Sequence, residues 1–257
     1  MKMFVGKINP AIMFIQKFPH GKRKSKHAIQ NRTLAPEQTG VTGEKLIDCV
    51  EKLVGQDWFQ NEEFDGILIE DDRDDRFLMK VGDGSSALDI DAWNDFRIKA
   101  TERIQRIAPD IPVVILCASP EVESWFLLDW SNSFGSVYQE DFTAAQNAYF
   151  SHTFHEYVKT EILGTAYQEH VESFGCKNGR YVKLSELLQA ALDEHDFLEN
   201  FGPKDEHPTV RYSKRTHGSK MLEELVPEVV AQNCGDAEHS PFHSAYHQLK
   251  SFTAQEE

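Results

Sequence analysis

Two short apolar runs constrain the fold of this chain more than any other feature of its sequence. Phe64–Ile69 (FDGILI) and Pro112–Cys117 (PVVILC) each have the length and composition of a strand buried on both faces. Ala92–Ile107 lies between them and has the apolar spacing of a helix, as does Gly43–Val54 upstream. The alternation of helix and strand predicts an α/β fold with a parallel sheet. The expected core positions of the intervening helix are Trp93, Phe96, Ile104 and Ile107.

The two ends of the chain differ from this central pattern. Met3–Ile8 and Ala11–Phe18 are both apolar, and either could form a first strand. Residues 19–42 are polar and basic, with the Gly, Pro and Thr content of a long loop. We expect an α/β domain over residues 1–130 and a mostly helical region over 131–257. The C-terminal expectations are helices at Phe142–Gly164, Lys183–Leu198 and Lys220–Ala231, with no strand after Cys117 except a short one at Arg180–Val182.

Composition narrows the class of protein. The 257 residues include 27 Lys and Arg against 42 Asp and Glu, a net charge of −15, and 40% of them are hydrophobic. This apolar content supports a core, and no run reaches the ~18–20 residues of a membrane helix. The acid excess excludes a generic nucleic-acid coat protein, because affinity for phosphate comes from Lys and Arg. Four widely spaced cysteines with no CxxC pair predict reduced thiols in a cytoplasmic protein.

The first group of candidate site residues follows the strand predicted at Phe64–Ile69. The segment Ile67–Asp75 (ILIEDDRDD) holds five acids, at the carboxyl end of a strand, where ligands bind in parallel sheets. Glu70 and Asp72 are two residues apart, so both can lie on one side of the strand end, as coordination of Mg²⁺ or Mn²⁺ requires. The alternative is a solvated acidic turn.

The second group follows the strand predicted at Pro112–Cys117. In Ser119–Trp130 (SPEVESWFLLDW), acids interrupt an otherwise apolar segment, at Glu121, Glu123 and Asp129. If a helix begins at Pro120, the first two of these acids lie in its first turn, where negative charge is favourable without any function. Paired with the first group across neighbouring strand ends, they indicate a metal site.

Together these residues resemble the TOPRIM-like nucleases of the RloB and abortive-infection type. The resemblance rests on an acid-x-Asp motif, on a later Pro-x-x-Glu-x-Trp-x-Leu-x-Asp segment and on two C-terminal blocks, and it covers roughly residues 64–130 and 210–250. It implies a TOPRIM-like parallel-sheet core that binds Mg²⁺, phosphodiester chemistry on DNA or RNA, and a bacterial anti-phage system with an ABC-type ATPase partner. The matching residues are Glu70, Asp72, Asp74, Asp75, Pro120, Glu123, Trp125, Leu127, Asp129, Arg211–Pro227 and His239–Leu249.

The sequence departs from that family in one functional position. TOPRIM proteins carry a Glu-Gly pair after the first strand, and here Thr42-Gly43 occupies the comparable place, with Glu44 one residue beyond. An inactive, binding-only TOPRIM-like subunit is therefore an alternative to a nuclease. In an active enzyme, the expected metal ligands are Glu70, Asp72, Asp74 and Glu123. The other expected site residues are Glu44 as general base, Lys214 and His217 on phosphate, and the basic run Lys22, Arg23, Lys24 and Lys26 on nucleic acid.

Three other interpretations carry less weight. LIEDD followed by IPVVILCAS is also similar to a response-regulator receiver, but that fold needs a phospho-acceptor strand where Ala87–Ile107 predicts loop and helix. A non-catalytic interaction subunit would make the acids purely structural. His239, His243 and His247 lie on one face of a predicted helix near Cys234, but no zinc motif accompanies them. GxSxG, P-loop and GxGxxG motifs are absent from the sequence.

Overall fold

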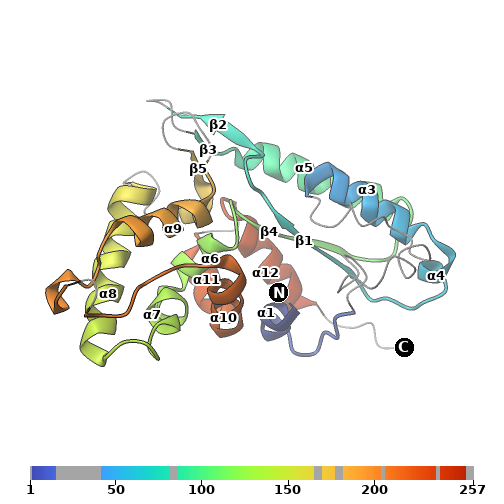
Figure 1. Ribbon diagram of the computed structural model, residues 1–257. Helices are drawn as coiled ribbons and strands as arrows, with labels where there is room; N and C mark the ends of the chain where they lie inside the picture. Colours follow the sequence, from blue (N-terminus) through green and yellow to red (C-terminus); the bar gives the residue numbers. More distant parts are fainter. Residues whose placement is uncertain are drawn as a thin grey trace, which may run out of the picture.

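Two parallel strands form the centre of the protein. The structure, a computed structural model, describes residues 2–15, 42–81, 86–164, 170–176, 182–203, 206–235 and 238–252 (Figure 1). Strand β1 (Ile67–Asp72) pairs with β4 (Val113–Ala118), and the register runs to Asp72 opposite Ala118. The mixed α/β class and the parallel pairing are therefore confirmed.

Helices cover both faces of this two-stranded sheet. Figure 1 shows α3 (Gly43–Val54) and α5 (Ile90–Gln105) on one side of β1 and β4, and α1 (Lys2–Ile8) and α12 (Pro241–Ser251) on the other. Alternate residues of a strand point to opposite faces of the sheet. The apolar residues of β1 and β4 therefore contribute to two separate hydrophobic cores, one on each face. Ile69 and Ile115 belong to the core beneath α3 and α5, whereas Leu116 and Ala118 belong to the core that includes residues of α1 and α12.

The N-terminal strand predicted from the sequence is wrong. Residues Lys2–Ile8 form a helix because Phe4, Val5 and Ile8 are spaced to bury one helical face. Residues 11–15 contain no strand, and residues 16–18 lie outside the described part of the chain. The predicted basic loop, residues 19–42, also lies outside it, apart from Thr42 at the start of α3.

The predicted central elements occur with shifted ends. The helix over Gly43–Val54 has the predicted bounds, and Asp89 caps the N-terminus of α5 by accepting a hydrogen bond from the Ala92 N–H at 3.0 Å. The buried positions predicted for α5 are confirmed for Trp93, Phe96 and Ile104, but Ile107 is exposed because the helix ends before it. Strand β1 begins three residues later than predicted, so Glu70, Asp71 and Asp72 belong to the strand itself.

A second, antiparallel sheet of three short strands lies beside the first. Its strands are β2 (Leu78–Lys80), β3 (Ser86–Leu88) and β5 (Phe174–Cys176), in the order β2-β3-β5. The prediction of no strand after Cys117 is therefore wrong, because a three-residue strand is too short to show periodicity. Of the short strand predicted at Arg180–Val182, only Val182 is described, and it is not in a strand.

Most of the other described segments are helical, and the region after β4 is mostly helical, as predicted. Pro227 divides the helix predicted over Lys220–Ala231 into α10 and α11, since proline is favoured at the first position of a new helix. The bounds of these helices are α4 (Asp57–Gln60), α6 (Glu123–Leu128), α7 (Phe134–Val137), α8 (Ala144–Tyr157), α9 (Leu184–Glu194), α10 (Ser219–Glu224) and α11 (Pro227–Asn233). Among the described residues, no helix has the length and apolar content required to cross a bilayer.

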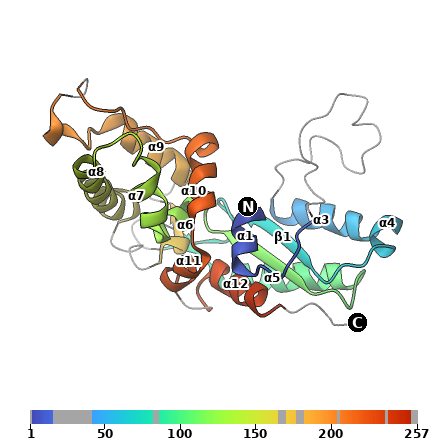
Figure 2. The ribbon, with the colours of Figure 1, turned by 90° about the horizontal axis from the view of Figure 1, so that it is seen from below.

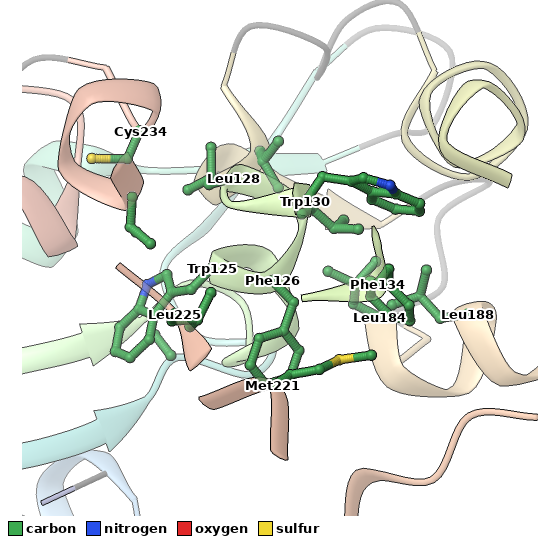
Figure 3. Close-up of a cluster of buried hydrophobic side chains, with 14 of the residues drawn as sticks. Trp125, Phe126, Leu128, Trp130, Phe134, Leu184, Leu188, Met221, Leu225 and Cys234 are labelled. Atoms are coloured by element: carbon green, nitrogen blue, oxygen red, sulfur yellow. The ribbon is translucent and has the colours of Figure 1, made fainter. Parts of the chain in front are cut away.

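Helix α6 is at the centre of the larger core. Its Trp125 and Phe126 are fully buried, and Figure 3 shows side chains of α9 and of the C-terminal helices around them, among them Leu184, Met221 and Leu225. Figure 2 shows α12 returning beneath the strands, and it packs against β4. The core thus includes residues from both sides of position 130, and α6 is buried within it directly after β4.

Candidate acidic site at the strand ends

The acids at the end of β1 point to opposite faces of the sheet. Asp71 faces α3 and is almost completely buried, where its carboxylate accepts hydrogen bonds from Arg76 Nη2 at 2.7 Å and from the Gly43 N–H at 3.2 Å. Gly43 has a φ of +59°, and a Cβ at this position would collide with the Arg76 guanidinium, so glycine is required here. Asp71 is therefore a structural acid that joins β1 to the start of α3.

Asp72 faces the opposite side, where two further acids follow β4. Glu121 and Glu123 are both fully buried, and Glu123 is the first residue of α6. The Glu121 carboxylate accepts a hydrogen bond from the Ser185 N–H at 3.1 Å, in the first turn of α9. The Tyr212 hydroxyl donates to Glu123 Oε1 at 2.6 Å. Two segments distant in sequence, the first turn of α9 and the segment at Tyr212, therefore hold these two carboxylates in place.

Two lysines lie against these carboxylates. Lys214 Nζ is 3.3 Å from Glu121 Oε1 and 3.4 Å from Glu123 Oε2. Lys183 Nζ is 3.4 Å from Asp74 Oδ1 and 3.7 Å from Glu121 Oε1. We call the set of Asp72, Asp74, Glu121, Glu123, Lys183 and Lys214 the acidic cluster.

Burial and repulsion from neighbouring acids raise the pKa of two acids in this cluster, Asp72 and Glu123. The pKa of Asp72 is raised to about 6, mainly by burial; Lys214 opposes this shift, and Asp74, Glu121 and Glu123 add to it. Burial also raises the pKa of Glu123, although Lys214 and Tyr212 oppose the shift. The pKa of Lys214 rises despite its partial burial, because Glu123, Glu121 and Asp72 stabilise its charged form. These couplings show that Asp72 shares one electrostatic environment with the acids that follow β4.

Glu70 lies on the same face of β1 as Asp72 but nearer the middle of the strand. Its side chain is exposed, yet partial removal from water raises its pKa. None of the described residues forms a hydrogen bond or ion pair with its carboxylate. The structure thus places Glu70 and Asp72 on one face, as their spacing predicts, and Asp74 at the margin of the cluster beside Lys183.

Two of the other predicted residues lie apart from the acidic cluster. Glu44 forms an ion pair with Arg103 Nη1 at 2.6 Å on the α3 side of the sheet. His217 is partly buried between Tyr138 and Tyr212, and its Nδ1 accepts a hydrogen bond from the Ser213 N–H at 3.0 Å. The basic residues Lys22, Arg23, Lys24 and Lys26 lie outside the described part of the chain.

The sequence gives little indication that some residues of the acidic cluster, or their partner Tyr212, belong to this site. Glu121 follows β4 just as Glu123 does, so its position after a buried strand was the sequence feature that could have indicated it as a site residue. Tyr212 and Lys183 lie far from both strands in sequence, and only the fold shows that they contact these acids. Asp129, part of the motif that suggested the family, accepts a hydrogen bond from the Val226 N–H at 2.8 Å and joins α6 to the start of α11.

The donor types in the cluster fit a hard divalent cation, but Lys214 occupies part of the space between them. Carboxylate oxygens are the ligands that Mg²⁺ and Mn²⁺ prefer, and Glu123 Oε2 is buried without a hydrogen bond. Within the described ranges, however, no group of three or more His, Cys, Asp or Glu side chains is arranged to hold a metal ion. As it stands, the arrangement holds Lys214 against two of the carboxylates and does not form a metal site.

Comparisons with known proteins give no match for this chain. No protein-family model matches the sequence, and neither the search of curated proteins nor the search of solved structures returns a similar protein. The case for a function therefore rests on the sequence motifs and on the geometry of the acidic cluster.

Proposed function

We propose that the protein is a TOPRIM-like, Mg²⁺-dependent nuclease that hydrolyses phosphodiester bonds in DNA or RNA. The observation that carries this proposal is the meeting of Asp72, at the end of β1, with Glu121 and Glu123, which follow the neighbouring parallel strand. The carboxyl ends of parallel strands are where α/β proteins bind ligands, and acids concentrated there repel each other unless a cation is bound.

The residues of the cluster have separable roles in this proposal. Asp72 and Glu123, with Glu70 beside them, would hold Mg²⁺, or Mn²⁺ in its place. The chemistry that such a metal supplies is activation of water and neutralisation of charge on the scissile phosphate. Tyr212 orients Glu123 through its hydroxyl, and Lys214 provides a positive charge for the phosphate.

A cleavage assay with matched variants tests the proposal. Plasmid DNA and single-stranded RNA are incubated with the wild type, Asp72→Asn, Glu123→Gln and Asp95→Asn, each with Mg²⁺, Mn²⁺ or a chelator. Asp95 is the control because it is an exposed acid on α5 whose one partner among the described residues is Lys99, at 2.6 Å. We expect metal-dependent cleavage by the wild type and the control, and at least about a hundredfold loss in the two site variants.

Two results would contradict the nuclease. One is cleavage that survives both site substitutions, and the other is cleavage that persists in the chelator. Circular dichroism of each variant shows whether a loss of activity reflects unfolding.

The second candidate function is a catalytically inactive TOPRIM-like subunit that binds nucleic acid or a protein partner. The observation that favours it is the position of Lys214, whose ammonium group already offsets the charge of Glu121 and Glu123. Thr42, in place of the Glu of the family pattern, also favours it. Binding of nucleic acid without cleavage in any metal would select this alternative.

The cellular context follows only from the resemblance. We propose a bacterial anti-phage system in which an ABC-type ATPase is the partner. Co-purification of the chain with such an ATPase encoded beside it would support this assignment, and full cleavage activity by the isolated chain would make the partner unnecessary for catalysis.

A further inference from the structure

The segment His207–Leu222, which we call the basic stretch, differs in charge from the rest of this acidic chain. It contains no Asp or Glu, whereas the whole chain has 42 acids against 27 Lys and Arg among its 257 residues. A local reversal of charge in an acidic protein is the electrostatic feature of a surface that binds a polyanion. The Lys and Arg residues of the stretch are Arg211, Lys214, Arg215 and Lys220.

The inner side of the basic stretch is attached to the core and to the acidic cluster. The Tyr138 hydroxyl donates to the Arg211 carbonyl oxygen at 2.9 Å, and the buried Tyr212 donates to Glu123. Gly218 is also buried, and a Cβ at this position would lie 3.4 Å from the Tyr212 hydroxyl. The backbone from Arg211 to Gly218 is therefore anchored to the buried part of the protein at both ends.

The outer side of the basic stretch presents two arginines to solvent. Arg211 and Arg215 are exposed, and neither forms an ion pair with any described residue. The two lysines of the stretch differ, because each already pairs with at least one carboxylate. A guanidinium group carries its N–H donors in a planar fork that can bind two oxygens of one phosphate at once. The two arginines are thus the cations of this surface that remain available to a partner.

The carboxylates in contact with the basic stretch do not occupy these arginines. Glu121 and Glu123 are fully buried, and Lys214 lies against both of them. At the far end of the stretch, Glu140 pairs with Lys220 at 3.3 Å. These acids are paired with the lysines of the stretch, which leaves the charge of its arginines uncompensated.

We propose that Arg211 and Arg215 bind the phosphate backbone of a nucleic acid beside the acidic cluster. This surface deepens the proposed function and rests on it, because a nuclease has to hold its substrate next to the site of cleavage. Lys214 lies between the two arginines in the chain and contacts Glu121 and Glu123, so a strand bound along the stretch passes the cluster. Phosphate contacts carry no sequence information, so the surface binds strands of any sequence.

Binding measured in the absence of metal tests this surface. Fluorescence anisotropy follows labelled oligothymidylate, oligouridylate and a DNA duplex, each titrated with the full-length protein in a chelator at low salt. The test variant is Arg211→Gln/Arg215→Gln. The control is Lys45→Gln/Arg106→Gln, which removes the same charge from exposed positions on α3 and at the end of α5.

The arginine variant should bind at least about fivefold more weakly than the wild type, and the control variant should bind as the wild type does. Loss of two phosphate contacts should also reduce the slope of log Kd against log salt by about 1.4 for the single strands. Equal binding by the arginine variant, or an equal loss in the control, would overturn the surface.

The remaining outcomes separate this inference from the proposed function. Arginine-dependent binding by a wild type that cleaves nothing supports the surface and overturns the nuclease. Metal-dependent cleavage by a protein that binds none of the three probes overturns the surface and leaves the nuclease standing. Binding of labelled polyglutamate in place of the nucleic acids would make the partner an acidic protein, which also overturns the surface.

Steady-state cleavage gives a second readout if the enzyme is active. Phosphate contacts away from the reacting bond hold the substrate and the transition state equally, so their loss raises KM and leaves kcat unchanged. The arginine variant should therefore show a KM raised severalfold at an unchanged kcat. A fall in kcat at an unchanged KM would overturn the surface.

Discussion

Asp71 and Asp72 are neighbours in one strand, but they lie on opposite faces of the sheet in different surroundings. Asp71 has a guanidinium group at 2.7 Å and a backbone N–H within hydrogen-bond distance. The Asp72 carboxylate accepts no hydrogen bond from the described residues, and nearby acids add to the burial that raises its pKa to about 6. One acid is saturated with partners, and the other is not.

A strand divides a run of acids in the sequence between the two faces of its sheet. Successive side chains alternate between faces, so adjacent carboxylates cannot share one site. The α3 face supplies Arg76 and Gly43, which bind the Asp71 carboxylate and oppose the burial that raises its pKa. The opposite face supplies further acids and the loosely held Lys214, which leave capacity for a ligand. A solvated acidic turn would show neither environment.

The largest expected effect belongs to the saturated acid. Asp71→Ala leaves the Arg76 guanidinium without its carboxylate and the Gly43 N–H without an acceptor. Breaking a buried ion pair costs about 3–5 kcal/mol, and since Arg76 is partly exposed we expect a loss of about 3 kcal/mol in the free energy of unfolding. Urea unfolding at pH 7 measures it. A loss below about 1 kcal/mol would mean that Asp71 is not structurally saturated.

Asp72→Asn should have the opposite sign. The raised pKa means that the folded state keeps a proton which the unfolded state has lost, between pH ~4 and ~6. Stability therefore falls as pH rises through this window, and the deficit persists above it. Asn removes the charge, so we expect a gain of about 2 kcal/mol at pH 8 and almost none at pH 4. Urea unfolding at both pH values measures this, and a loss of stability at pH 8 would mean that the Asp72 carboxylate has stabilising partners, as Asp71 does.

Tyr212→Phe should have a smaller effect, confined to the unsaturated face. In the wild type the Tyr212 hydroxyl donates a hydrogen bond to Glu123 Oε1, and this bond lowers the pKa of Glu123. Loss of the hydroxyl removes that bond and leaves Lys214 as the main partner of Glu123. We expect about 1 kcal/mol of destabilisation at pH 7, less at pH 4, and a further rise in the Glu123 pKa. Thermal unfolding at both pH values checks this. A larger loss at pH 4 than at pH 7 would mean that Tyr212 does not act on the ionised acid.

The fold was predictable where the sequence carries a strong period or a clear boundary. Gly43–Val54 has several apolar turns, and the buried strand at Val113–Ala118 follows a Pro turn, so both could be placed closely. The strand offered for Met3–Ile8 is wrong because an apolar run of that length fits either a strand or a helix. Tertiary packing favours the helix, because it places Phe4 against Trp125, with 5.3 Å between the stacked ring centroids.

The candidate site was predictable in its acids and in Lys214, which the family resemblance indicated, but not in Lys183 or in the contacts that either lysine makes. Position after a buried strand indicated Asp72 and Glu123, because strand ends converge in a parallel sheet. The pairing of Lys214 with both Glu121 and Glu123 depends on how the C-terminal segment returns to the sheet, and no local pattern encodes that. The pairing of Glu44 with Arg103 likewise depends on tertiary structure, so the sequence did not show that the expected general base lies on the α3 side of the sheet.

The smallest expected effect belongs to Glu44. Its side chain is 69% exposed, and Arg103 keeps Asp48 and Glu51 as partners, both within 2.6 Å, when Glu44 is lost. Glu44→Gln should change the free energy of unfolding by less than about 0.5 kcal/mol and should leave metal-dependent cleavage unchanged. Parallel urea titrations and cleavage assays with Glu123→Gln measure both. Loss of cleavage in a stable Glu44→Gln would mean that the α3 face takes part in the chemistry, and that the division between the two faces of β1 does not hold.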